Sequence, residues 1–245
     1  MLNAPQLHAA AIRFGIPIPA TVVEAHRFEA EASRLLAEAN AAQPPDLHAA
    51  TSETLAAVLE AAVAFGTNDA RRTIAQELHN QSPGRIDHAW HAAGLGGILE
   101  AFRQPFDDAI ARFADALDKL APIANPDGGI NPSRAIEAGL EKAYKSYTAA
   151  AADLSILGQV RMMIAGSMTR QDLGIDGGGD NNYPTISLFA DLSDRAQVTR
   201  LNVLLGDCRP LEPLWWIKLL GLPGVTVRWH GAGEQVHVAE IGRRT

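Results

Sequence analysis

The sequence contains very little cysteine: Cys208 is the only one in 245 residues. A single cysteine cannot form an internal disulfide, and a multi-cysteine zinc site needs more than one thiolate. Nucleophilic catalysis by Cys208 would require a base that lowers the pKa of its thiol, and no neighbouring residue suggests such a base. The composition therefore excludes a fold stabilised by internal disulfide bonds and a cysteine-rich metal site.

Clusters of basic residues are also scarce. The formal net charge is −7 and the sequence pI is about 5.6. Proteins that bind nucleic acids usually carry a basic patch or stripe. The clustered arginines here are the pairs Arg71–Arg72 and Arg243–Arg244, which are typical of solvated surface. We therefore expect no nucleic-acid partner.

Long hydrophobic runs are missing as well. His8 and Arg13 interrupt the first twenty residues, which a signal peptide would need to keep apolar. The most apolar later segment, residues 213–225, is too short to span a bilayer and contains Lys218. The sequence predicts no membrane partner and a location in the cytoplasm or within a soluble assembly.

Alanine is abundant and is concentrated in residues 1–166. Apolar residues recur there at spacings of three and four, which is the pattern of amphipathic helices. The four series run over residues 21–39, 47–65, 99–120 and 136–154. Seams lined by alanine bury little area per residue, so each helix needs a partner along its length. The pattern predicts long antiparallel helical hairpins or a coiled-coil-like bundle, either monomeric or completed by another copy of the chain.

Several residues indicate where these helices break. Residues 82–84, Ser-Pro-Gly, predict a turn, and Pro105 predicts a kink or a new start within the third series. The glycines of residues 94–97 indicate a hinge or a close helix contact. Asn131 is expected to cap a helix that has Pro132 in its first position.

The composition changes after residue 166. Residues 167–184 are rich in glycine, asparagine and aspartate and predict a linker. Residues 185–245 predict a small α+β module. The expected fold is therefore mostly α, with the helical region at residues 1–166 followed by the linker and the module.

Within this module, strict alternation predicts a strand at residues 186–192, and helical spacing follows at residues 193–206. A short second helix is expected to end at Gly221. Residues 225–241 predict a C-terminal β-hairpin with its turn at Gly231–Gly233.

Three histidines raise the hypothesis of a metal site. His88 and His91 lie three residues apart on a predicted helix, so both can approach one ion. His79 joins them only if the turn at residues 82–84 folds back, and Asp87 is a further ligand or base. No zinc or di-iron ligand motif accompanies them. The alternative places His88 and His91 on a helix surface, and we predict no cofactor.

An ion-binding loop is a second hypothesis. Asp176 and Asp180 lie among glycines and asparagines, and their oxygens suit calcium. The spacing of an EF-hand is absent, and the same composition serves a flexible linker. Motifs for nucleophilic catalysis and for nucleotide binding are also absent from the sequence. The sequence therefore predicts no catalytic residue and favours a protein that is not an enzyme.

Trp215 and Trp216 are the candidate partner-binding residues. Adjacent helical residues point about 100° apart, so one small helix does not bury both against the same surface. One tryptophan would then anchor the core and the other would bind a partner, because tryptophan is enriched at binding hot spots. In the alternative, sheet and linker residues bury both rings.

Together these features favour a non-enzymatic structural or interaction protein. Its alanine-rich seams would mediate self-association or docking to a protein partner, and the α+β module would dock through Trp215 and Trp216. A helical stalk with a small module is a layout used in phage-like particles and other large assemblies, although layout does not fix function. Two alternatives remain: a helical-bundle metal-dependent enzyme using His79, His88 and His91, and a monomeric regulatory adaptor.

Overall fold

The computed structural model describes residues 2–46, 51, 53–126, 128–168, 189–191, 205 and 208–231. In these residues the chain is mostly helical, with one two-stranded antiparallel sheet. The chain forms two compact units, Ile18–Ala93 and the combination of Met1–Pro17 with Gly94–Thr245. The division does not follow the compositional boundary at residues 167–184, because residues from both sides of that boundary share one core.

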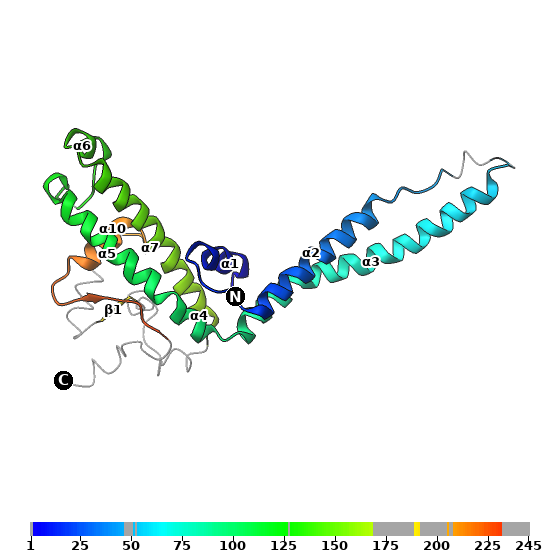
Figure 1. Cartoon of the computed structure of the whole chain (residues 1–245), viewed down its shortest axis with the longest axis horizontal. Helices are drawn as coiled ribbons and strands as arrows, with labels where there is room; N and C mark the ends of the chain where they lie inside the picture. The colour runs from blue at the N-terminus through cyan, green and yellow to red at the C-terminus, as the bar shows by residue number, and fades with distance from the viewer. Residues whose placement is uncertain are drawn as a thin grey trace. The chain divides into compact units, whose positions relative to one another are not determined.

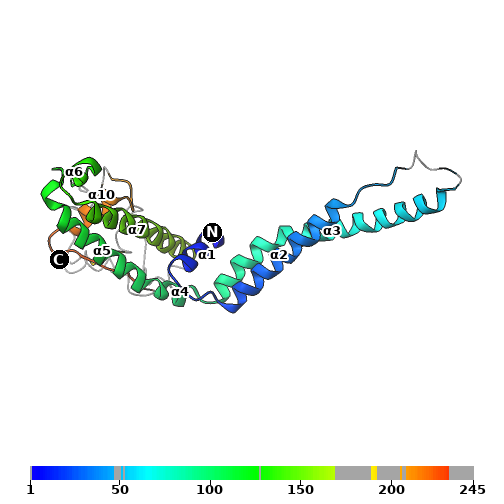
Figure 2. The same cartoon turned by 45° about the horizontal axis from the view of Figure 1, so that its top comes forward.

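The unit Ile18–Ala93 is a hairpin of two helices, α2 (Ala20–Ala41) and α3 (Leu55–Ala92), which lie side by side (Figure 1). The Thr21 hydroxyl donates to the backbone carbonyl of Ala89 over 3.5 Å, and the Asn68 amide donates to that of Ala39 over 2.7 Å. The start of α2 therefore meets the end of α3, and the helices are antiparallel. Figure 2 shows that α3 continues past the end of α2.

Small residues line the seam between α2 and α3. Besides Val22, Ile86 and Trp90, the buried residues are small and repeat every seven positions: Ala25, Ala32 and Ala39 on α2, and Ala75, Ser82 and Ala89 on α3. A seven-residue repeat keeps one helix face on its partner when two helices wind around each other in a left-handed sense. The expected antiparallel hairpin with an alanine-rich seam is present in this pair.

The expected turn at residues 82–84 is wrong, because α3 runs through Pro83 as one helix. Proline in a helix interior removes a backbone hydrogen bond and costs about 3 kcal/mol. Here Pro83 itself is exposed, while Ala75, Ser82 and Ala89 on either side of it are buried in the seam. Packing along both flanks of the proline overrides the local preference for a turn.

Two expected break points are confirmed. After α3 ends, Gly94 has a φ of +87°, a left-handed conformation that glycine adopts without a steric penalty. Next come α4 (Leu95–Ala101) and α5 (Arg103–Leu120). Pro105 lies in the first turn of α5, where its missing N–H needs no helical partner.

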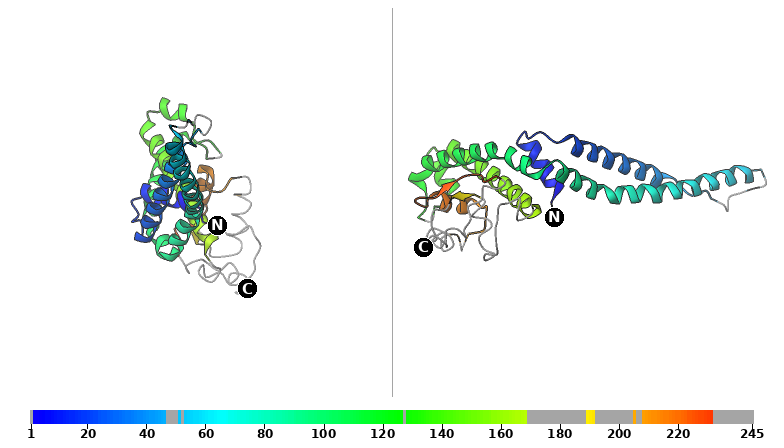
Figure 3. Two further views of the ribbon diagram at one scale, coloured as in Figure 1. Left: turned by 90° about the vertical axis from the view of Figure 1, so that its right-hand side faces the viewer. Right: turned by 90° about the horizontal axis from the view of Figure 1, so that it is seen from below.

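The other unit is built on α1 (Ala4–Arg13), α5 and α7 (Glu141–Ser167). Figure 3 shows α5 and α7 side by side, and the rings of Phe113 and Tyr147 stack between them at 5.2 Å. The 3₁₀ helix η2 (Ala121–Ile123) follows α5.

The helix α6 (Pro132–Glu137) precedes α7 and begins at the expected cap, where Asn131 accepts a hydrogen bond from the Ser133 amide at 2.9 Å. The sequence predicted one continuous helix over residues 136–154. Instead, Gly139 has a φ of +68° and separates α6 from α7. That break leaves Ile136 exposed.

The sheet pairs β1 (Ala190–Asp191) with β2 (Thr226–Val227), in the register Ala190 to Val227 and Asp191 to Thr226. Both strands lie within segments expected to be extended. The expected short helix is also present as α10 (Pro213–Leu220), with Gly221 at its C-cap. The return strand of the expected hairpin lies outside the described residues, as does the expected helix at residues 193–206 apart from Leu205.

One aromatic cluster forms the centre of this unit: Phe106, Phe189, Trp215, Trp216 and Trp229, all of which are buried. Phe106 and Phe189 stack at 5.6 Å, and Phe189 meets Trp216 edge to face at 5.3 Å. Each such pair contributes about 0.5–1.5 kcal/mol beyond its buried area. The cluster joins α5 to segments that follow the predicted linker, which is why helices and module belong to one unit.

Candidate functional site

The two adjacent tryptophans belong to the core. Trp215 is 2% exposed and Trp216 is 0% exposed, and their rings meet at right angles with centroids 4.6 Å apart. The Trp216 indole donates to the backbone carbonyl of Leu211 over 3.2 Å. Phe189 contacts both rings, so a residue from another segment buries what one helix face could not. The structure matches the alternative in which both are core, and neither ring is exposed for a partner.

The three histidines do not converge. His79 is half-buried, with its Nδ1 atom 3.2 Å from the Ser33 hydroxyl, whereas His88 and His91 are exposed. Because α3 is continuous, nine residues separate His79 from His88, or about 13 Å along the axis. No group of three or more His, Cys, Asp or Glu residues in the described part of the chain is placed to hold a metal ion. The metal hypothesis thus gains no support from these residues. The candidate ion ligands Asp176 and Asp180 lie outside the described residues.

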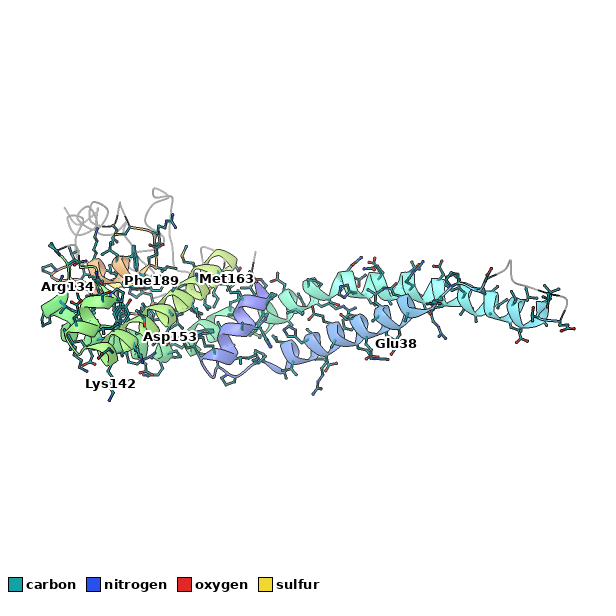
Figure 4. All side chains as sticks on the ribbon, turned by 90° about the horizontal axis from the view of Figure 1, so that it is seen from above. Glu38, Arg134, Lys142, Asp153, Met163 and Phe189 are labelled. Carbon is teal, nitrogen blue, oxygen red and sulfur yellow. The ribbon has the colours of Figure 1, made fainter. Side chains whose placement is uncertain are left out.

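A shallow pocket of about 450 Å³ lies where α1, α5 and α7 meet, and it is lined by Arg13, Phe14, Pro105, Asp108, Arg112 and Asp153. Figure 4 labels Asp153 on α7. Its carboxylate accepts hydrogen bonds from Arg13 at 2.7 Å and from Arg112 at 2.9 Å. Two arginines and two aspartates leave the pocket with no net charge. We interpret this network as a structural tie between the three helices.

Arg161 of α7 is the most unusual charged residue of this unit. Its side chain is fully buried, and its three guanidinium nitrogens lack a hydrogen-bond partner among the described residues. The ring of Trp229 lies beside it, with its centroid 6.0 Å from the guanidinium carbon, at the outer limit of a cation–π contact. Burial lowers the pKa of Arg161 to about 10, because desolvation penalises the charged form. Arg161 does not line the pocket between α1, α5 and α7.

The remaining candidate is a surface on α3 that we call the outer stripe: Leu55, Leu59, Val63, Gly66, Ala70 and Ile74. All six residues are exposed, and the four large ones keep 61–64% of their surface in water. Spacings of four, four, three, four and four residues place them on one helix face. The seam residue Ala75 lies on a different face, about 100° around the helix from Ile74.

The outer stripe was not recognised in the sequence. The predicted series over residues 47–65 assigned Leu55 to the buried face together with Val58, Ala62 and Phe65. The structure instead leaves Leu55 61% exposed, while those three residues are half-buried. The spacing of Leu55, Leu59 and Val63 was the available signal, since it defines a second apolar face on the same helix.

Comparisons with known proteins add no further constraint: no family model, curated protein or solved structure matches this chain. Each helix in the described residues is too short or too polar to cross a bilayer.

Proposed function

We propose that this chain is a non-enzymatic structural protein that binds other protein chains through its α2–α3 hairpin. The observation that supports the proposal is the outer stripe. Single exposed apolar residues are common on protein surfaces, but apolar residues aligned along one helix face mark an interaction surface. Large repeating assemblies, such as phage-like particles, require chains that present such surfaces.

The length of α3 supports the same proposal. Asn68 forms a hydrogen bond with Ala39, close to the end of α2. Residues 55–67 of α3 therefore extend beyond α2, which packs against the remainder of α3. An isolated helix of about 12–15 residues is marginally stable in water. A second surface packed on the outer stripe would supply the burial that this part of α3 does not obtain from α2.

Native mass spectrometry of the full chain tests the proposal, because one spectrum reports both subunit number and bound metal. We expect a metal-free oligomer. The double substitution L59E/V63E should reduce it to a monomer, because two charges in the outer stripe cannot be desolvated without partners. The matched control I136E changes an equally exposed isoleucine on α6 and should leave the mass unchanged.

Three results would contradict the proposal. A metal-free monomer at every concentration would favour the monomeric adaptor, and a monomer that carries transition-metal ions would favour the enzyme alternative. An oligomer that persists in L59E/V63E would show that the outer stripe is not the contact surface.

A further inference from the structure

The outer stripe is asymmetric along its length. Its first three residues, Leu55, Leu59 and Val63, are large, whereas two of its last three, Gly66 and Ala70, are small. Close packing between helices requires large side chains of one surface to meet small ones of the other. Between Leu59 and Ala70, a surface with the same residues in the reverse order therefore fits this stripe, because it sets small residues against large ones.

We propose that the outer stripe binds the outer stripe of a second copy of this chain, with the two α3 helices antiparallel. This inference rests on the proposed function and names its partner. A two-fold axis between residues 64 and 65 places Leu59 against the partner's Ala70 and Val63 against the partner's Gly66. Leu55 then meets the partner's Ile74 at each end. The helices approach closely near the axis, where the glycines have no side chain.

The charged residues beside the outer stripe also favour the antiparallel arrangement of the two α3 helices. Glu60 and Arg71 lie eleven residues apart, which is close to three full helical turns, so they are on the same flank of α3. Neither takes part in an ion pair among the described residues. In the antiparallel pairing, Glu60 lies within one turn of the partner's Arg71, and symmetry forms this pair twice.

A parallel pairing would be unfavourable at the same positions. It would put the flank that carries Glu60 and Arg71 on opposite sides of the interface in the two chains, so neither Glu60–Arg71 pair could form. It would also set Gly66 against the partner's Gly66 and leave an unfilled space between them. Both packing and charge therefore favour the antiparallel arrangement. The interface is short for a stable dimer, so we expect concentration-dependent association.

Charge reversal in the full chain tests this arrangement. E60R and R71E should each weaken the dimer about tenfold, because two attractive pairs become repulsive. The double variant E60R/R71E exchanges the charges and should restore the dissociation constant of the original chain. Sedimentation equilibrium measures all three, and E137R on α6 is a control that makes the same change in net charge as E60R.

Disulfide trapping supplies a second, independent measurement. In a C208S background, L59C and A70C are prepared separately, mixed and oxidised mildly. Antiparallel pairing predicts disulfide-linked dimers that contain one chain of each kind, because these two positions face each other. Parallel pairing predicts that each variant cross-links to itself.

The outcomes separate this inference from the proposed function. Suppose that L59E/V63E abolishes the dimer. Parallel cross-links, or unchanged dissociation constants in both charge-reversal variants, would then overturn the antiparallel pairing and leave the proposed function in place. A chain that remains monomeric throughout would overturn both. Restoration by E60R/R71E together with mixed cross-links would support both.

Discussion

Asn68 of α3 donates its side-chain amide to the backbone carbonyl of Ala39, 2.7 Å away, two residues before the end of α2. The last four carbonyls of a helix have no partner within that helix. Asn68 therefore satisfies one of these carbonyls from the neighbouring helix. The contact also marks where the seam ends, since the part of α3 that precedes Asn68 extends beyond α2.

Replacing Asn68 with alanine should lower the free energy of unfolding by about 1 kcal/mol, because the carbonyl of Ala39 loses a hydrogen bond in a half-buried position. Hydrogen exchange should also speed up in the last turn of α2. Chemical denaturation with exchange measurements checks both effects. T67A is a suitable control, because Thr67 bonds to Val63 within its own helix. Equal stability of N68A and T67A would show that the contact does not fix the end of α2.

Replacing Pro83 with alanine should stabilise the hairpin. Pro83 is an exposed residue in the interior of α3, and proline there costs about 3 kcal/mol relative to alanine. P83A should therefore raise the free energy of unfolding by part of this amount. Differential scanning calorimetry would detect the change as a higher melting temperature. If residues 82–84 formed a turn, P83A would leave the melting temperature unchanged or lower it.

Gly158 of α7 packs against Leu211, which is buried and holds a φ of +69°. A Cβ atom at position 158 would lie 2.5 Å from the Leu211 Cδ2 atom. Alanine improves helix propensity by about 1 kcal/mol, but overpacking a core contact costs about 1–3 kcal/mol. We therefore expect G158A to be neutral or destabilising.

The double variant G158A/L211A separates these two effects. Removing the Leu211 side chain relieves the overlap, so the double variant should lose less stability than the sum of the two single variants. Urea denaturation of the four proteins measures the coupling. Strict additivity would mean that residues 158 and 211 are not in contact.

Arg161 should be replaceable by methionine with a gain in stability. The lowered pKa of this buried arginine means that the folded state holds its proton less tightly than the unfolded state does. The charged form therefore penalises folding at every pH below about 10. R161M should raise the free energy of unfolding at neutral pH by about 1–3 kcal/mol. A loss of several kcal/mol would instead show that an anion pairs with the guanidinium in solution.

Features set by local chemistry could be predicted from the sequence. The cap at Asn131, the break at Gly94, the restart near Pro105 and the end of α10 at Gly221 each depend on one or two residues and their immediate neighbours. The alanine-lined hairpin follows from periodicity in the same way.

Features set by distant residues could not be predicted. The continuity of α3 through Pro83 depends on α2, and the burial of both Trp215 and Trp216 depends on Phe106 and Phe189. The outer stripe was missed for a similar reason. Periodicity shows that α3 has two apolar faces, but only the position of α2 decides which of them stays exposed.

The hairpin Ile18–Ala93 is an insertion within the other unit, whose residues precede it and follow it in the chain. Its seam repeats every seven residues, so adding seven residues to α2 and seven to α3 lengthens the hairpin by one repeat and keeps the same faces together. None of these changes alters the aromatic cluster. The length of this hairpin can thus be adjusted in fixed steps, by design or by evolution, without changing any residue of the other unit.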